Sequence, residues 1–223
     1  ASGELRQINV SDKAVSAPLA TGVETISLFG DGSDLAYVSS DDAMRTVTIL
    51  SGSKKTVIRS LAKEVPLRLD TDVYHGQRYI VLATNRSAEI ITDISEAENS
   101  RSVANLIMGQ LGDIALLDTS INGRFVRLSS QGSQLLYDLE DKKSYRVALA
   151  NVLAYRWLDD LHLYSTQDGT ARLVDFDGSN QQDLLTVIPA SATYLTHSPT
   201  SLYAFRPTES SGVELVVINL EKR

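Results

Sequence analysis

The most informative absence in this sequence of 223 residues is cysteine. Without cysteine, disulfide bonds, zinc–thiolate sites and thiol catalysis are excluded together. No apolar run approaches the ~18 residues of a membrane span, and no signal peptide opens the chain. We therefore expect any membrane attachment only through an anchor upstream of this sequence.

Basic residues are also too few and too scattered for a nucleic-acid surface. The net charge is −7, and the only basic pairs, Lys54-Lys55 and Lys142-Lys143, fall at expected hairpin turns. A nucleic-acid partner is therefore not expected. The hydrophobic fraction of 43% and the charged fraction of 22% are ordinary for a globular domain with a core.

What the sequence does contain is a series of short apolar runs separated by turn residues. Between Val152 and Val187 there are four such runs, each about the length of a strand. Asp168-Gly169 and Asp177-Gly178 separate the later runs, and Asp-Gly pairs are a strong hairpin signal. We predict strands at Val152–Leu158, Leu161–Thr166, Ala171–Phe176 and Asp183–Val187.

This unit repeats along the chain. Arg124–Leu149 aligns with Leu161–Val187 run for run, with the turn Glu140–Lys143 matching Asp177–Asn180. Four strands recurring at a period of roughly 37–47 residues are the signature of β-propeller blades. The predicted fold class is all-β, a β-propeller of four-stranded antiparallel blades, and the chain is interpreted as one domain, residues 1–223.

The predicted blades do not fill the chain evenly. Complete blades cover about 23–61, 66–107, 114–149 and 152–187, with partial blades at 3–20 and 192–223. The first partial blade has strands Gly3–Val10 and Ala14–Ala20, and the last has only three strands. Since unpaired edges recruit partners, we expect five to six blades in the intact ring, or self-association through open blade edges.

The turn pattern resembles bacterial propellers of the TolB-like, WD40-like superfamily. The resemblance rests on Leu161–Asn180, LHLYSTQDGTARLVDFDGSN, where a strand, an Asp-Gly turn, a second strand and a D-x-D-G-x-N turn follow in that order. It extends to the propellers of PEGA-domain-containing bacterial surface proteins. The resemblance implies an extracytoplasmic location, at the cell surface or in a membrane-anchored parent.

Acidic residues on first strands are the candidates for chemistry. Asp70, Asp72 and Asp118 are expected to face the central channel, as the carboxylates of propeller glycosidases do. A carbohydrate-active enzyme is therefore the alternative function. Against it, aromatic residues make up only 6% of the chain, with a single tryptophan. The other interpretation is that these acids solvate the channel and form turns.

Metal binding has one weak candidate. Asp175, Asp177 and Asn180 place oxygen ligands at the alternating spacing of calcium loops, but the later bidentate Glu of such loops is missing. A plain turn between two strands is the alternative, and no cofactor is expected otherwise. The histidines, His75, His162 and His197, fall at or near first turns of different blades and are interpreted as solvated turn residues.

Aromatic and arginine residues concentrate in the last two units. On an exposed rim they would suit protein recognition, although alternation should turn about half of them into the core. Since no nucleophile elbow or phosphate loop occurs, we expect a non-enzymatic binding or scaffolding module that recognises a protein or a cell-surface polysaccharide. The candidate rim residues are Tyr155, Arg156, Trp157, Tyr194, Tyr203 and Arg206.

Overall fold

The protein is built almost entirely of antiparallel β-strands. The computed structural model describes residues 3–30, 32, 34–92, 101–109, 112–189, 191, 193–197 and 200–220. Among them there is one short 3-10 helix with assigned bounds, η3 (Val152–Ala154), and no α-helix. No helix in the described ranges is long and apolar enough to cross a membrane.

Five sheets follow one another in chain order. The first has the order β1-β4-β5-β6-β7, and the next three have four strands each, β8 to β11, β12 to β15 and β16 to β19. The last has three strands, β20-β21-β22. Their bounds are β1 Gly3–Leu5, β4 Ala20–Leu28, β5 Asp34–Ser40, β6 Met44–Ser51, β7 Lys54–Ala62, β8 Arg68–Tyr74, β9 Gln77–Ala83, β10 Ser87–Thr92, β11 Arg101–Ile107, β12 Leu116–Thr119, β13 Phe125–Ser130, β14 Ser133–Asp138, β15 Lys143–Ala148, β16 Arg156–Trp157, β17 His162–Ser165, β18 Thr170–Asp175, β19 Gln182–Thr186, β20 Tyr194–His197, β21 Thr200–Pro207 and β22 Val213–Asn219.

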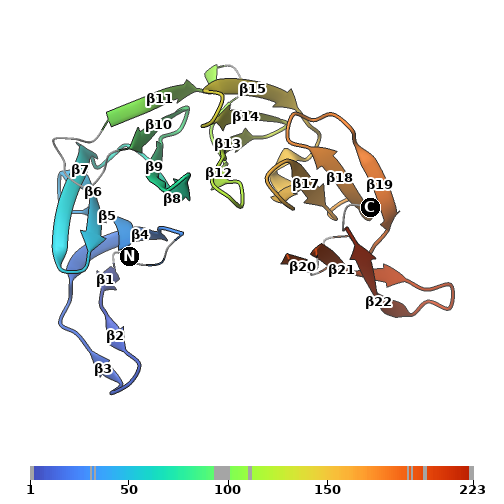
Figure 1. Cartoon of the computed structure of the whole chain (residues 1–223), viewed down its shortest axis with the longest axis horizontal. Helices are drawn as coiled ribbons and strands as arrows, with labels where there is room; N and C mark the ends of the chain where they lie inside the picture. Colours follow the sequence, from blue (N-terminus) through green and yellow to red (C-terminus); the bar gives the residue numbers. More distant parts are fainter. Residues whose placement is uncertain are drawn as a thin grey trace.

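The sheets are arranged along an arc, like blades around an axis (Figure 1). The first strands β8 and β12 lie on the inner side of the arc, and the fourth strands β11 and β15 run along its outer side. β8 contacts both β4 and β12, so the inner strands of neighbouring sheets adjoin. The predicted propeller of four-stranded antiparallel blades is confirmed as the fold class.

The core lies between consecutive sheets because both faces of each middle sheet are apolar. Between the first and second sheets, for example, Val38 and Ile49 pack in one cluster with Ile80 and Ile91. We call the face that a sheet turns toward the next sheet its trailing face, and the face toward the previous sheet its leading face. Similar clusters lie between the second and third, third and fourth, and fourth and fifth sheets.

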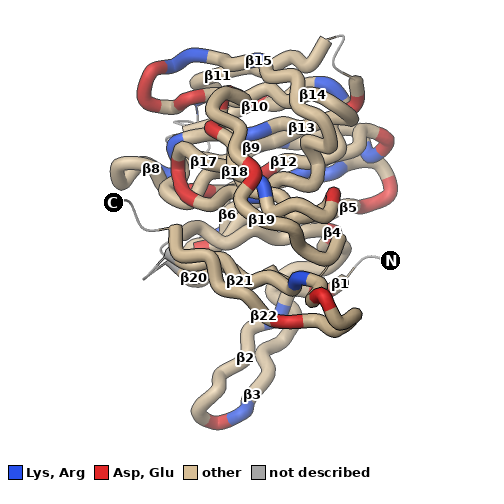
Figure 2. The backbone as a smooth tube through the Cα atoms, turned by 90° about the vertical axis from the view of Figure 1, so that its right-hand side faces the viewer, with Lys and Arg blue, Asp and Glu red and all other residues tan. Residues whose placement is uncertain are grey.

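The N-terminal strands differ from the prediction. Instead of forming a separate partial blade from Gly3–Val10 and Ala14–Ala20, the segment adds β1 to the first sheet, with Gly3 opposite Val23. The chain then forms a hairpin of β2 (Ile8–Asn9) and β3 (Ala14–Val15), which projects from the sheet (Figure 1 and Figure 2). The physical reason is that β4 offers an unpaired edge to the residues just before it, and short segments pair with the nearest such edge.

The first strand of the fourth sheet is also shorter than predicted. Val152–Leu158 was expected to be one strand, but it forms η3 followed by the two-residue β16. Asn151 precedes η3 with a left-handed backbone, φ 55°. The 3-10 turn carries Val152 into the core between the third and fourth sheets, so burial there outweighs strand pairing.

The three strands of the last sheet agree closely with the predicted Ala192–His197, Ser201–Arg206 and Val213–Leu220. Ala192 and residues 221–223 of that predicted partial blade lie outside the described residues.

Candidate functional site

The three predicted channel acids lie on inner strands, where the chain order placed them. Asp70 and Asp72 are on β8, and Asp118 is on the neighbouring β12. Because side chains two residues apart on a strand share one face, Asp70 and Asp72 point to the same side of β8. The hydroxyl of Thr119 on β12 donates to Asp70 Oδ2 at 3.4 Å, which brings the two strands together around this acid.

Asp70 is held by donors from three sheets. Its Oδ1 accepts hydrogen bonds from the Thr71 backbone N–H at 2.9 Å and from the Ser27 hydroxyl of β4 at 3.4 Å. The pKa of Asp70 is raised to about 6, chiefly by burial; the negative charges of Asp72 and Asp118 also raise it, and the hydrogen bonds from Thr71 and Ser27 lower it. A buried carboxyl with this pKa is partly protonated near neutral pH.

Asp72 is packed against a turn of the third sheet. A Cβ added at Gly123 would lie 2.8 Å from Asp72 Cγ and 3.0 Å from the carbonyl oxygen of Val73, so only glycine fits there. The backbone N–H of Asn122 in the same turn donates to Asp160 Oδ1 of the fourth sheet at 2.8 Å. Burial raises the pKa of Asp72 as well. The turn at Asn122-Gly123 therefore links the second, third and fourth sheets.

Asp118 forms an ion pair with Arg127, a residue that the sequence analysis missed. The Arg127 side chain is 0% exposed, and its Nε donates to Asp118 Oδ1 at 2.7 Å while Nη2 donates to Oδ2. Nη2 also donates to the Tyr155 carbonyl at 3.0 Å, and the guanidinium lies 5.5 Å from the centre of the Trp157 ring. Asp118 thus neutralises a buried cation, which leaves its oxygens committed to Arg127.

The candidate calcium loop closes on itself. Asn180 Nδ2 donates to Asp175 Oδ2 at 2.6 Å, and Asp177 Oδ1 accepts from the backbone and the hydroxyl of Ser179 at 2.9 and 2.6 Å. His162 Nε2 lies 3.6 Å from Asp175 Oδ1. These contacts use oxygens that a cation would need. Within the described ranges, no group of three or more acidic or histidine side chains is placed to hold a metal ion.

The other ring nitrogen of His162 also has a partner, since Nδ1 lies 2.8 Å from the Asp159 carboxylate. His75 sits in the tight turn after β8 with φ 50°, and its ring packs against Tyr74 at 4.3 Å between centroids. The side chain of His197 lies outside the described residues. His75 and His162 therefore both have local partners, Tyr74 for the first and Asp159 for the second.

Two of the predicted rim residues are wrong. Tyr155 is 2% exposed and Trp157 is 9% exposed. Both belong to the cluster between the third and fourth sheets, where Trp157 stacks on Phe125 with ring centroids 6.1 Å apart. The 3-10 turn before them, which the sequence analysis did not predict, turns these side chains inward. The other four, Arg156, Tyr194, Tyr203 and Arg206, are exposed or half-buried.

The exposed aromatic residues instead gather on the trailing face of the last sheet. Tyr194 lies opposite Tyr203, which lies opposite Val217, and Phe205 lies opposite Leu215. Residues directly opposite in an antiparallel sheet share one face. Tyr194 is 68% exposed and Leu215 is 58% exposed. We call this surface the β20–β22 face: Tyr194, Tyr203, Phe205, Val213, Leu215 and Val217.

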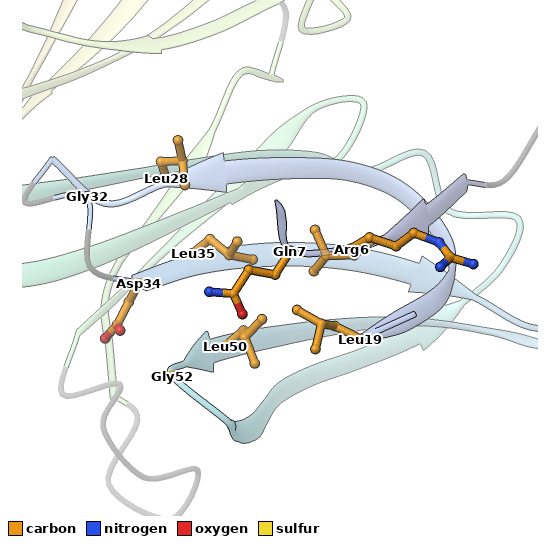
Figure 3. Close-up of a pocket in the computed structure, with 10 residues that line it drawn as sticks. Arg6, Gln7, Leu19, Leu28, Gly32, Asp34, Leu35, Leu50 and Gly52 are labelled. Carbon is orange, nitrogen blue, oxygen red and sulfur yellow. The ribbon is translucent and has the colours of Figure 1, made fainter. Parts of the chain in front are cut away.

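The opposite end of the arc carries a pocket. It measures about 230 Å³ and lies between the N-terminal segment and the leading face of the first sheet. Leu28, Leu35 and Leu50 of the first sheet line it, and Leu19 of the N-terminal segment lies beside Leu50 (Figure 3). The polar groups of Arg6, Gln7 and Asp34 also line it. The pocket therefore combines a base of leucine side chains with a polar lining of nearly equal extent.

Comparison with protein-family models finds no match, and no curated protein matches the sequence. Among solved structures, the WD40 domain of SCAP from fission yeast is similar over 97% of this chain and 64% of its own length, with 12% identity and a TM-score of 0.55. A putative 6-phosphogluconolactonase from Bacteroides uniformis is similar over 97% of this chain and 74% of its own, with 12% identity and a TM-score of 0.52.

TolB from Acinetobacter baumannii aligns over 97% of this chain and 57% of its own, with 12% identity and a TM-score of 0.47. The chain thus spans less than two thirds of the length of TolB and of the WD40 domain. The likeness to the WD40 domain, at a TM-score of 0.55 and 12% identity, bears on the fold alone. Together with the repeated four-stranded sheets, it identifies the chain as a β-propeller.

Proposed function

We propose that the chain is a non-enzymatic binding or scaffolding propeller whose recognition surface is the β20–β22 face. The observation that carries this proposal is that Tyr194, Phe205 and three aliphatic side chains are exposed on one face of a sheet, together with the half-buried Tyr203. Contiguous exposed apolar surface of this kind marks interaction sites. Aromatic residues are also enriched among those that contribute most to protein binding.

The predicted rim residue Arg206 is not part of this face. It lies opposite Glu214, with which it forms an ion pair, and both residues alternate onto the other side of the sheet, the side of Ala204 and Val216. The β20–β22 face itself is apolar and aromatic, as the centre of a protein–protein interface is. A protein partner therefore fits this face better than a polysaccharide, for which hydrogen-bonding groups beside the aromatic rings would be needed.

The wider setting is also a proposal. The single domain over residues 1–223, the extracytoplasmic location and the membrane-anchored parent with PEGA domains are supported only by the blade pattern and the sequence resemblance described above. A cell-envelope polymer as partner has the same support. These features would be tested by locating the protein in fractionated cells.

The binding proposal is tested by site-specific photo-crosslinking in cells. A photoreactive phenylalanine replaces Phe205 on the β20–β22 face or, as the control, Ile107 on the outer strand β11, which is 64% exposed. We expect a defined protein adduct from position 205, its loss when Leu215→Lys is added, and no such adduct from position 107. Adducts of equal yield at both positions, or none at 205, would refute the proposal.

A second candidate function is favoured by one observation. The pKa of Asp70, raised to about 6 by burial, suits a general acid, as a carbohydrate-active enzyme would require. Glycoside hydrolysis also needs a second carboxylate. The neighbouring Asp118 does not suit that role, because it is paired with Arg127. The test is glycan cleavage by the purified chain and by Asp70→Asn. Cleavage that disappears in Asp70→Asn, but not in Leu215→Lys, would overturn the non-enzymatic proposal.

A further inference from the structure

The geometry points to a second copy of this chain as the occupant of the β20–β22 face. In this arrangement the β20–β22 face of one copy packs on the leading face of the first sheet of the other. The inference deepens the proposed function, because it names the partner of the same β20–β22 face, and it rests on that proposal. The surface that this face would bind, the leading face of the first sheet, is present in the chain itself.

The internal junctions show what such a face accepts. From the first sheet to the last, the chain has four junctions, and each packs a trailing face on a leading face through a cluster of buried apolar residues. At the last junction, Leu202 and Ala204 of β21 pack with Ala171 and Val187 of the fourth sheet. The leading face of the last sheet is therefore covered in the same way as the others.

The trailing face of that sheet has the composition of a junction but is exposed. It alternates along β22 with the covered face, so that Val213, Leu215 and Val217 are exposed whereas Val216 and Ile218 pack against the core cluster. A strand that is apolar on both faces is typical of sheets buried on both sides. The β20–β22 face therefore has the surface of a blade that another blade covers.

The matching half is the leading face of the first sheet. Register places Leu28 opposite Leu35 and Leu35 opposite Leu50, so these three leucines share one face. Ile26 on the same face is exposed, and Leu28 is 60% exposed even though the N-terminal segment covers part of the sheet. One copy of the chain thus displays both halves of a single kind of junction.

The two halves also offer a pocket on one side and exposed aromatic side chains on the other. The leading face carries the pocket of about 230 Å³ with leucines at its base, and Tyr194 and Phe205 are exposed on the β20–β22 face. Aromatic anchors seated in apolar pockets dominate the energy of many interfaces. The hairpin beside the pocket adds exposed Ile8, Val10 and Val15, which extend the apolar surface that a second copy would meet.

The arrangement is head to tail, because the two faces lie at opposite ends of the arc (Figure 1). A heterologous contact of this kind leaves one face of each type open in a dimer, so association continues until a ring closes or a filament forms. This distinguishes it from a symmetric dimer, in which the same face would pack on itself.

The experiment compares the purified full chain with two surface variants by sedimentation velocity and multi-angle light scattering. Leu215→Lys places a charge on the β20–β22 face, and Leu28→Lys places one on the leading face. Ile107→Lys, at a comparably exposed apolar position of an outer strand, is the matched control. Near-ultraviolet circular dichroism and the melting temperature verify that each variant is folded.

We expect dimers and larger species for the natural chain and for Ile107→Lys at concentrations of about 1 to 300 μM. Each face variant alone should be monomeric, with association weakened about 30-fold or more. An equimolar mixture of Leu215→Lys and Leu28→Lys should form dimers and nothing larger, because each variant keeps the one face that the other needs.

Three results would overturn the inference. The first is a natural chain that stays monomeric over the whole concentration range. The second is a mixture of the two variants that stays monomeric while the natural chain dimerises, because the two unaltered faces then do not pack on each other. The third is a single face variant that still dimerises alone, which would mean that its unaltered face packs on itself. A monomer that still gives the protein adduct from position 205 would refute only the second copy and leave the proposed binding role intact.

Discussion

The clearest quantitative test of the structure is to remove the charge that neutralises Arg127. Asp118→Asn keeps the size of the side chain but leaves a fully buried guanidinium without a carboxylate. Of the remaining contacts, the Tyr155 carbonyl accepts from Nη2 at 3.0 Å, and Nη1 has no hydrogen-bond partner within the described structure. An uncompensated buried charge is among the most destabilising changes known in proteins.

The size of the effect follows from the burial of each partner. Breaking a buried ion pair by removing one side costs about 3–5 kcal/mol. We expect about 3 kcal/mol here, at the lower end of that range, because Asp118 is itself partly exposed and asparagine retains one acceptor oxygen. For a chain of this size, this lowers the melting temperature by about 6–12 °C.

The matched control is the same substitution in an exposed pair. Asp113 binds Arg86 at 2.9 Å, and both side chains are largely exposed. Asp113→Asn should change the free energy of unfolding by less than about 0.5 kcal/mol. Adding Arg127→Met to Asp118→Asn should recover most of the loss, since no unpaired charge then remains buried. If Asp118→Asn costs no more than Asp113→Asn in urea unfolding, the structural role assigned to this pair is wrong.

Further predictions concern titration, backbone and metal. Because the pKa of Asp70 is raised from 3.8 to about 6 in the folded state, the fold binds this proton more tightly than the unfolded chain does. The stability that this bound proton gives is lost as the pH rises from about 4 to about 7. Over that window the free energy of unfolding of Asp70→Asn, measured with urea, should therefore rise by on the order of 3 kcal/mol relative to that of the natural chain. A difference between the two proteins that does not change with pH would contradict the assignment. Gly178→Ala should cost about 1–2 kcal/mol more than Gly132→Ala, since both glycines have positive φ but only the new Cβ at Gly178 would meet Val147, at 2.5 Å. Calcium or EDTA should move the melting temperature by no more than about 1 °C, because the Asp175 carboxylate already binds Asn180; a larger shift would show that the loop opens to bind the ion.

Features of the fold that depend on local turn chemistry were predictable from the sequence. Gly169 and Gly178 adopt φ 77° and 85°, as the Asp-Gly hairpin signals require. The predicted strand Ala171–Phe176 is found at Thr170–Asp175, one residue earlier at each end. Turn residues act on their immediate neighbours, so their effect can be read without knowing the rest of the fold.

Pairing at the N-terminus depends on distant residues and was not predictable in this way. The predicted strand Gly3–Val10, GELRQINV, has nearly the pattern of the predicted strand Val213–Leu220, VELVVINL. Only Gly3–Leu5 joins the first sheet, whereas Val213–Asn219 is a full strand. The difference is that β22 pairs along the whole of β21, while the N-terminal segment finds only part of the β4 edge.

The Asp118–Arg127 pair shows a signal that was present but unused. In a hairpin centred on Asn122-Gly123, residues at equal distances before and after the turn lie opposite each other. Asp118 and Arg127 are such a pair, and they lie opposite each other in the structure. An arginine in the apolar run Phe125–Leu128 is unexpected unless a carboxylate lies opposite. Turn position and strand register together would have assigned Asp118 to a structural ion pair.

The inner acids and the exposed end faces therefore differ in what their replacement should change. Asp70 and Asp72 are partly buried acids with raised pKa values, and Asp118 is paired with the buried Arg127, so changing these residues acts on the free energy of unfolding. Leu28 and Leu215 are exposed and touch little of the core, so charged replacements should leave folding intact and act on association. Measuring both quantities for both sets separates residues that hold the blades together from residues that bind a partner. If replacing the acids changed association, or if replacing Leu28 and Leu215 changed the free energy of unfolding, the two roles assigned here would be wrong.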